Sequence, residues 1–139
     1  MKIILIGSNG RMGKTMQEYL REKNIEFVAI DKNNRQELKN KTADIIVDFS
    51  TSEALAQNLE VAASKNIPIV VATTNHSLQN FNLFKVYKKR LAIFYSPNMS
   101  IQFNLIAEFI KKLKVLNDCD FVITETHHKQ KKDKPSGSA

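Results

Sequence analysis

Six short runs of aliphatic and β-branched residues constrain the fold of this 139-residue chain more than any other feature. The runs are Lys2–Ile6, Glu26–Ile30, Ile45–Phe49, Pro68–Ala72, Leu91–Tyr95 and Phe121–Thr124. They are short for helices, and their continuous apolar content predicts strands that are covered on both faces. Segments with helical periodicity separate most of them, as in parallel sheets built from strand–helix–strand units. The sequence therefore predicts an α/β fold with a doubly wound, Rossmann-type parallel sheet.

The segments between the strands predict helices with identifiable ends. Asn24 follows the first helical pattern and is a suitable stop. Ser50 and Glu53 have the spacing of a capping box, and Ser100 could cap a long amphipathic helix. The apolar residues that define the four helices are Met12, Met16, Tyr19 and Leu20; Leu55, Leu59 and Ala62; Leu78, Phe81, Phe84 and Val86; and Ile101, Leu105, Phe109, Ile110 and Leu113.

Composition indicates the compartment and the partners. Cys119 is the only cysteine, so no internal disulfide can form, which suits a reducing cytoplasm. The N-terminal apolar run is too short for a signal peptide, and no run approaches the roughly 20 apolar residues that span a bilayer. The net charge of +7 gathers partly at Lys129–Lys134, where a solvated loop is the simplest interpretation. We expect a cytoplasmic protein with no membrane or nucleic-acid partner.

A glycine-rich turn follows the first predicted strand. Gly7, Gly10 and Gly13 stand between that strand and a helix, where a turn of this kind brings backbone N–H groups and a helix N-terminus to a pyrophosphate. Asp31 ends the second strand, where dinucleotide-binding folds place the acid that binds the adenosine ribose. Asp31 favours NADH by repelling a 2′-phosphate, whereas Lys32 attracts that phosphate. The cofactor is therefore NADH or NADPH, with the preference open.

The same turn also resembles the P-loop of nucleotide hydrolases. Residues 8–15 differ at one position from G-x-x-x-x-G-K-[ST], and Ile45–Asp48 resembles the strand and aspartate that hold magnesium in such proteins. We reject this alternative because Ser8 occupies the position of the first glycine and Gly7 falls one residue too early.

The C-terminal segment from Glu125 to Ala139 carries the other chemical signal. His127 and His128 titrate near neutral pH, and Lys131 could bind a carboxylate or support proton donation. The Pro-Ser-Gly-Ser sequence that follows offers backbone N–H groups to an anion. Together these groups suit a small dicarboxylate that needs a proton, although an isolated histidine pair is more often a surface feature. No metal site is predicted, since Cys119 and the residues near His127 lack zinc-ligand spacing.

In combination, these motifs resemble the dihydrodipicolinate reductase family. The glycine turn, Asp48-Phe49-Ser50, Pro97-Asn98-Met99-Ser100 and the segment Glu125–Ala139 each match a family motif, the last position by position. One departure lies after the fourth strand, where Ala72-Thr73-Thr74-Asn75 replaces the usual Gly-Thr-Thr-Gly. Ala72 adds a methyl group near the nicotinamide, and Asn75 can still adopt the left-handed conformation, so we expect a weaker or reshaped cofactor contact and not its loss.

The resemblance implies an NADH- or NADPH-dependent reductase of lysine synthesis, with His127 as the general acid and Lys131 in support. It implies that the substrate carboxylates contact His128, Lys131, Gly137 and Ser138. It implies cofactor contacts from Gly7, Ser8, Asn9, Gly10, Arg11, Met12, Asp31, Lys32, Ala72, Thr73, Thr74, Ser96, Pro97, Asn98 and Met99.

The resemblance also implies a domain organisation. Residues 1–124 would be the dinucleotide-binding domain, and residues 125–139 only the start of a substrate and tetramerisation domain that continues in family members. We expect residues 129–139 to be mobile without that continuation. The alternative to an enzyme is a truncated, non-catalytic nicotinamide-binding domain of the same family.

Overall fold

The structure, a computed structural model, describes residues 1–96, 98–115, 118–120, 122–127 and 129. The chain divides into two compact units, Met1–Tyr95 and Ser96–Ala139. The predicted domain boundary between residues 124 and 125 lies inside the second unit and stays a prediction. The expected mobility of residues 129–139 concerns positions outside the described residues, apart from Lys129.

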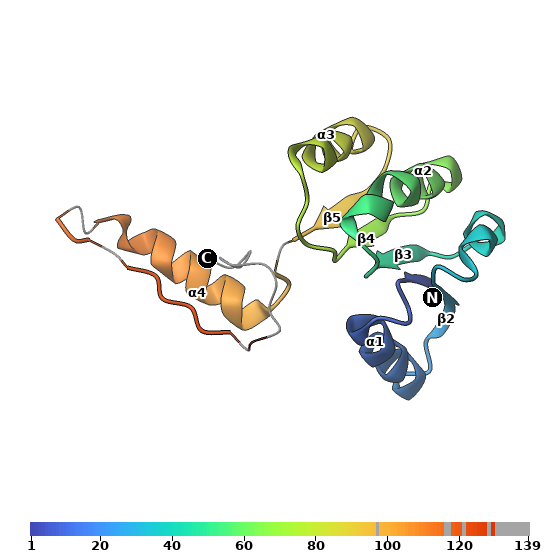
Figure 1. The fold of residues 1–139 in the computed structure, drawn as a ribbon, viewed down its shortest axis with the longest axis horizontal. Coiled ribbons are helices and arrows are strands. Elements are labelled where there is room, and N and C mark those ends of the chain that lie inside the picture. The colour runs from blue at the N-terminus through green and yellow to red at the C-terminus, as the bar shows by residue number, and fades with distance from the viewer. Residues whose placement is uncertain (97, 116–117, 121, 128, 130–139) are drawn as a thin grey trace. The chain divides into compact units, whose positions relative to one another are not determined.

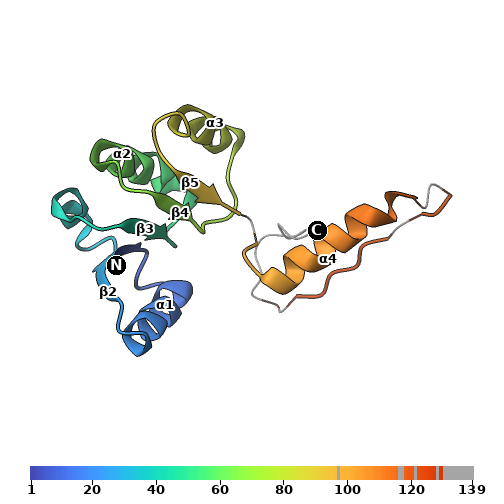
Figure 2. The same cartoon turned by 180° about the vertical axis from the view of Figure 1, so that it is seen from behind.

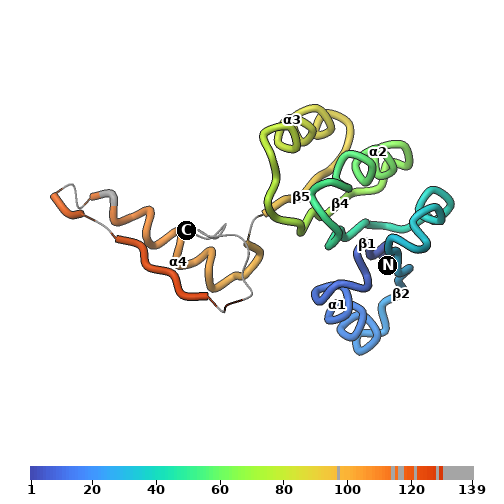
Figure 3. Tube along the Cα trace, viewed as in Figure 1, coloured from blue at the N-terminus to red at the C-terminus, as the bar shows by residue number. Residues whose placement is uncertain are grey.

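Five parallel strands form one sheet in the order β2-β1-β3-β4-β5 (Figure 3). They are β1 (Lys2–Ile6), β2 (Glu26–Ile30), β3 (Ile45–Asp48), β4 (Ile69–Val71) and β5 (Ile93–Tyr95). Ile6, the last residue of β1, pairs with Ile30 on one side and Asp48 on the other, so three strands end together. The chain moves outward in opposite directions from β1 and from β3. Such a reversal opens a crevice at the carboxyl ends of the strands, where ligands of doubly wound sheets bind.

The helices lie on both faces of the sheet, as right-handed crossovers require. Figure 1 shows α1 (Arg11–Glu22) on one face and α2 (Leu55–Lys65) with α3 (Leu78–Tyr87) on the other. Asn24 and Asn66 end α1 and α2 in the left-handed conformation, with φ of 54° and 53°. The main core lies between the sheet and α2, and it includes Ile4, Ile6, Ile30, Ile46, Leu55, Leu59, Ala62, Ile69 and Val71. The predicted doubly wound α/β fold is confirmed.

The predicted capping box at Ser50 and Glu53 is wrong. A short 3-10 helix, Ser52–Ala54, precedes α2, and the α2 N-cap residue Ala54 provides no side-chain cap. The Ser50 hydroxyl instead donates to a carboxylate oxygen of Asp48 at 2.5 Å. A tertiary partner therefore replaces the local backbone contact that the sequence spacing suggested. The predicted cap at Ser100 is confirmed, because its side chain accepts from the Phe103 N–H at the start of α4 (Ile101–Lys112).

The prediction that every strand is covered on both faces holds only in part. On the face that carries α1, Val47 and Val70 are half-buried and Phe94 is 58% exposed within the first unit. The reason is topological, because α1 connects β1 to β2 and covers that end of the sheet alone. The continuous apolar runs of β3 to β5 predicted burial of both faces, but within the first unit this face of the three strands is only partly buried.

The second unit differs more from expectation. Residues 122–124 of the predicted strand Phe121–Thr124 form no strand, and Phe121 lies outside the described residues. A strand needs a hydrogen-bonded partner, and these residues instead run alongside α4 (Figures 1 and 2). The apolar positions Ile101, Leu105, Phe109 and Ile110 of α4 are more than half exposed. Within the described residues, no helix is long and apolar enough to cross a membrane.

Candidate functional site

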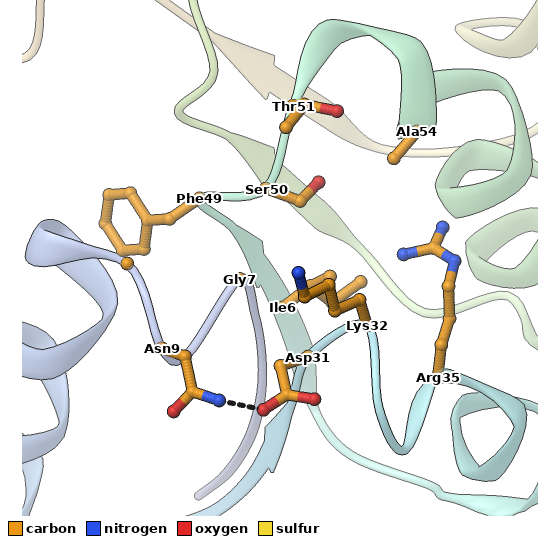
Figure 4. A pocket seen from close by; sticks show the side chains of 11 residues that line it. Ile6, Gly7, Asn9, Asp31, Lys32, Arg35, Phe49, Ser50, Thr51 and Ala54 are labelled. Carbon is orange, nitrogen blue, oxygen red and sulfur yellow. Dashed lines mark hydrogen bonds between the residues drawn. The ribbon is translucent and has the colours of Figure 1, made fainter.

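A pocket of about 400 Å³ lies at the carboxyl ends of β1, β2 and β3, where the strand order predicts a ligand site (Figure 4). It brings together five of the predicted cofactor residues from two separate segments. The residues that line it are Ile6, Gly7, Asn9, Gly10, Asp31, Lys32, Arg35, Phe49, Ser50, Thr51 and Ala54.

Two glycines of the turn are required by close backbone packing. Gly7 has a φ of +79°, and a Cβ there would lie 2.5 Å from the carbonyl carbon of Phe49. A Cβ at Gly13 would lie 2.6 Å from the carbonyl oxygen of Ser8. The glycines therefore let β1, the segment after β3 and α1 approach one another, which forms the pocket wall.

The N-terminus of α1 supplies N–H groups for an anion, but not all residues of the turn contribute. The N–H groups of Gly7 and Ser8 donate to the carbonyl of Ile30, at 2.9 and 3.2 Å, so the sheet already uses them. Gly10 is the N-cap and has no side chain, and the first turn of α1 contains no acidic residue. An anion can therefore approach the first-turn N–H groups and the positive end of the helix dipole.

The remaining predicted residues of the turn lie outside this pocket. Ser8 is buried beneath the turn, where its carbonyl accepts from the Gln17 side chain at 2.8 Å. Arg11 and Met12 are exposed at the start of α1 and do not line the pocket. Arg11 remains close in sequence to the helix N-terminus, so a long flexible side chain can still reach a bound anion.

Asp31 is held in one orientation at the pocket wall. One carboxylate oxygen accepts from the Asn9 side-chain amide (Figure 4), and the other accepts from the Asn33 N–H at 2.6 Å. The Asp31 N–H donates to the Asn34 side chain at 2.8 Å. The turn and the end of β2 are thereby joined at the position where dinucleotide-binding folds recognise the adenosine ribose.

A buried polar cluster behind the pocket removes the P-loop alternative. Asp48 is 0% exposed, and its carboxylate accepts from the Ser50 N–H, the Ser50 hydroxyl and the Asn58 amide at 2.5 to 2.8 Å. A magnesium-binding aspartate must face the bound nucleotide. Here the carboxylate is enclosed by protein donors, while Lys14 and Thr15 of the P-loop-like sequence are exposed.

Arg35 is a pocket residue that the sequence reasoning missed. It begins the 3-10 helix Arg35–Asn40, which is not among the predicted helices. Its Nε donates to Gln57 at 2.8 Å and a terminal nitrogen donates to Asn58 at 2.5 Å. Its position four residues after Asp31, following Lys32, was the available signal, but only the 3-10 helix brings the side chain back to the pocket. Phe49 and Ser50 belong to the Asp48-Phe49-Ser50 motif but were not predicted to be site residues, and Thr51 was not singled out at all.

The segment after β4 was predicted to face the nicotinamide. Ala72 follows β4 beside the end of β3, and its N–H donates to the Asp48 carbonyl at 2.9 Å. Thr73 is buried and Thr74 is exposed, and neither lines the pocket at β1 to β3. Asn75 has a φ of 61°, so it does adopt the left-handed conformation that its short polar side chain allows.

His76 fixes this segment and was not predicted. Its Nε2 lies 3.0 Å from both the hydroxyl and the carbonyl of Thr73, and its Nδ1 lies 3.0 Å from the Asn80 amide. Phe84 and Tyr95 pack against the ring edge to face. Burial lowers the pKa of His76 below 6.5, against weaker opposing effects of the Thr73 carbonyl and the Asp48 charge. The folded protein therefore favours the neutral ring.

This low pKa gives the first unit a stability that depends on pH. The unfolded chain binds a proton at His76 more readily than the folded chain, so stability is complete above pH 6.5 and falls as the pH drops through the folded-state pKa. We expect the melting temperature to fall less between pH 7 and 5 in His76→Phe than in the unmodified chain. Thermal scans by circular dichroism would show this, and parallel curves for the two proteins would contradict it.

The predicted loop Ser96–Met99 begins the second unit. The Ser96 hydroxyl donates to the Asn98 carbonyl at 2.7 Å, and the Asn98 side chain accepts from the Ser100 N–H at 2.9 Å. The Asn104 amide also donates to the Asn98 carbonyl, at 2.9 Å. Met99 is exposed, and Pro97 lies outside the described residues. The loop is thus shaped by its own hydrogen bonds and by the start of α4.

Of the predicted catalytic segment, the structure describes the part up to His127, with Lys129. His127 Nε2 lies 3.0 Å from a carboxylate oxygen of Glu125, and the two side chains are 24% and 25% exposed. The carboxylate can orient the imidazole, as carboxylates that are hydrogen-bonded to functional histidines do. His128, Lys131, Gly137 and Ser138 lie outside the described residues, so their roles stay predictions.

Comparison with known families accounts for these motifs. The sequence pattern described as "Dihydrodipicolinate reductase, N-terminus" matches residues 1–99, and its C-terminal counterpart matches residues 99–139. The chain belongs to the dihydrodipicolinate reductase family. The glycine turn, Asp31 and the threonines after β4 lie in the N-terminal match, whereas His127 lies in the C-terminal match.

Individual relatives agree with this assignment. The chain is 40% identical over 145 residues to a 4-hydroxy-tetrahydrodipicolinate reductase of Rickettsia rickettsii, and 37% identical over 153 residues to that of Caldanaerobacter subterraneus. All of the chain is covered, together with 61% and 60% of the two relatives. Among solved structures, dipicolinate-bound dihydrodipicolinate reductase from Paenisporosarcina has a TM-score of 0.66 at 18% identity. That comparison covers 99% of this chain and 62% of the other, and it supports the fold.

Proposed function

We propose that this chain binds a nicotinamide dinucleotide and carries the proton-donating part of a 4-hydroxy-tetrahydrodipicolinate reductase. The main support for this proposal is the pocket at the carboxyl ends of β1 to β3, where the glycine turn, the α1 N-terminus and Asp31 occur together. The pocket fits a dinucleotide because a pyrophosphate can contact the α1 N–H groups while the adenosine ribose contacts Asp31. NADH and NADPH are the two cofactors that this chemistry admits.

The remaining roles follow from the family and from the chemistry of the side chains. The bound nicotinamide would supply a hydride to the substrate ring. Thr73, Thr74 and the Ser96–Met99 loop would line the nicotinamide side. His127, oriented by Glu125 at 3.0 Å, would donate the proton. His128, Lys131, Gly137 and Ser138 would hold the two carboxylates of the substrate. A solved structure of another dihydrodipicolinate reductase is bound to dipicolinate, which is a dicarboxylate.

The proposal also covers properties of the whole enzyme, which is longer than this chain. The chain spans about three fifths of the length of the curated relatives that it matches. The reaction, the lysine pathway, a cytoplasmic location and a homotetramer are therefore proposed for the enzyme as a whole. For the chain itself, the second possibility is a nicotinamide-binding domain without turnover.

The test measures cofactor binding and turnover separately. Calorimetry would follow binding of each reduced cofactor to the purified chain, and absorbance would follow its oxidation with substrate generated in situ by the preceding enzyme. We expect binding in both the unmodified chain and His127→Ala, with any turnover lost in the variant. Binding without turnover identifies the non-catalytic domain. Absence of binding to either cofactor contradicts the proposed function.

A further inference from the structure

Strand β4 ends at the same edge of the sheet as the strands that form the dinucleotide pocket. Its last residue, Val71, pairs with Asp48 of β3, and the Ala72 N–H donates to the Asp48 carbonyl at 2.9 Å. Thr73 is then buried, whereas Thr74 is exposed. Within the described part of the chain, neither the N–H nor the hydroxyl of Thr74 forms a hydrogen bond. A ligand that extends from the pocket toward β4 would therefore meet unpaired donors.

The chain reverses its direction directly after Thr74. Asn75 is left-handed, with a φ of 61°, and the turn that it makes returns the His76 side chain to Thr73. The Nε2 atom of His76 lies 3.0 Å from the carbonyl oxygen and from the hydroxyl of Thr73. A buried carbonyl needs a hydrogen-bond donor, and His76 is the donor that the described residues provide to this one. The position of Thr73 therefore depends on the imidazole.

Asn80 of α3 determines which ring nitrogen of His76 carries the proton. The Asn80 amide nitrogen donates to the Ser52 carbonyl at 3.0 Å, and it also lies 3.0 Å from His76 Nδ1. Because an amide nitrogen is only a donor, Nδ1 must accept and is unprotonated. The proton of the neutral ring is therefore on Nε2, from which it is donated to Thr73. Asn80 thereby connects this network to Ser52, the neighbour of the pocket residue Thr51.

Aromatic packing fixes the plane of the same imidazole ring. The ring centroids of Phe84 and Tyr95 lie 5.5 and 5.2 Å from that of His76, and both interplanar angles are 78°. This edge-to-face arrangement is a favourable one for aromatic rings. A phenylalanine at position 76 would retain the packing and lose only the hydrogen bonds of the two ring nitrogens. Substitution can therefore separate the two contributions.

We propose that His76, as the Nε2–H tautomer, is a positioning residue for the nicotinamide end of the cofactor. It fixes Thr73 and thereby holds the unpaired donors of Thr74 where the nicotinamide carboxamide binds. The inference rests on the proposed dinucleotide binding and adds to it a residue that acts through Thr73. The carboxamide oxygen is an acceptor for the N–H or the hydroxyl of Thr74. Donors that are fixed in advance lose less conformational freedom on binding, so they bind more tightly.

The experiment compares the affinity of the full chain for each reduced cofactor with that for the matching fragment without the nicotinamide ring. The fragments are ADP-ribose for NADH and 2′-phospho-ADP-ribose for NADPH, and calorimetry gives the dissociation constants. We expect His76→Phe to weaken cofactor binding about fivefold, as the loss of one hydrogen bond would, and to change fragment binding by less than about twofold. The fluorescence of the bound reduced nicotinamide should shift toward that of the free cofactor.

Two further variants separate positioning from general stability. In His76→Gln, the side-chain amide nitrogen can take the place of Nε2 and donate to Thr73, so most of the cofactor affinity should return although the aromatic ring is lost. Tyr87→Phe is the matched control on α3, because it removes the hydrogen bond from the Tyr87 hydroxyl to Glu60 and no contact of His76. It should leave the affinities for cofactor and fragment unchanged.

Several outcomes would overturn the proposal. An equal loss of cofactor and fragment affinity in His76→Phe would show a general loosening of the first unit. Unchanged cofactor affinity in His76→Phe, or no recovery in His76→Gln, would show that the Nε2 hydrogen bond does not position the nicotinamide end. Each of these results leaves the proposed dinucleotide binding in place. Failure of the unmodified chain to bind either cofactor would contradict the proposed function itself.

Discussion

Gly7→Ala is expected to destabilise the first unit by about 3 kcal/mol or more and to abolish dinucleotide binding. The new Cβ meets the backbone of Phe49 at 2.5 Å, and backbone atoms of a neighbouring segment cannot rotate away as a side chain could. The φ of +79° adds the cost of a left-handed conformation at a residue with a side chain. Relief of the overlap would move the turn from the segment after β3, which forms the opposite pocket wall. Urea unfolding followed by circular dichroism would measure the loss.

Gly10→Ala is the matched control for this effect. Gly10 belongs to the same turn but has a φ of −70°, and its added Cβ would lie 3.4 Å from the nearest atom outside its neighbours, the Gly7 carbonyl oxygen. We expect a loss below about 1 kcal/mol, as for an ordinary change at a helix N-cap. Comparable losses at the two positions would show that the turn tolerates no substitution for some reason other than the backbone overlap at Gly7.

Asp48→Ala should produce a loss of similar size from a different cause. The substitution leaves three donors without their acceptor: the Asn58 amide, which is fully buried, and the Ser50 N–H and hydroxyl, which are half-buried. Each unsatisfied buried donor costs roughly 1 to 3 kcal/mol, so we expect at least about 3 kcal/mol in the free energy of unfolding. Because Asn58 also accepts a hydrogen bond from Arg35, the guanidinium should lose its fixed position as well.

Two further variants make the test specific. Asp48→Asn retains an acceptor for Ser50 but places an amide group against the Asn58 amide, so an intermediate loss is expected. Asp44→Ala removes an aspartate whose carboxylate accepts from the Lys2 N–H at 2.7 Å but is 66% exposed. Water can replace that acceptor, and the loss should stay near 1 kcal/mol or less. A loss at Asp44 as large as at Asp48 would mean that burial is not the cause.

The relation between sequence and structure is clearest at Ser50. Its spacing to Glu53 is that of a capping box, which is a local pattern, and local patterns compete with any partner that tertiary folding brings closer. The strand register places Asp48 beside Ile6 at the centre of the sheet, where a buried carboxylate must find donors. Ser50 meets that need, and α2 begins without a side-chain cap. The sequence shows both possible partners of Ser50, the helix N-terminus and Asp48. It does not show which of the two hydrogen bonds is the more favourable.

Residues that act through sequence-local geometry could be predicted from the chain alone. The order of strands and helices follows from apolar periodicity, and the places of Gly7 and Asp31 in the pocket follow from their positions directly after two strands. The left-handed conformation of Asn75 follows from the short polar side chain that tolerates it. Each of these depends on residues near one another in the chain, so the order of the sequence carries the information.

Only the tertiary structure revealed that Arg35 lines the pocket, that Asn58 holds it and that His76 fixes the segment after β4. These side chains meet partners from other segments, and the path of the intervening loop decides which partners they reach. The same holds for the exposed apolar faces of β5 and α4, whose residues are as hydrophobic as those of the core. Hydrophobicity specifies that a face favours burial, whereas only the arrangement of the elements decides whether anything covers it.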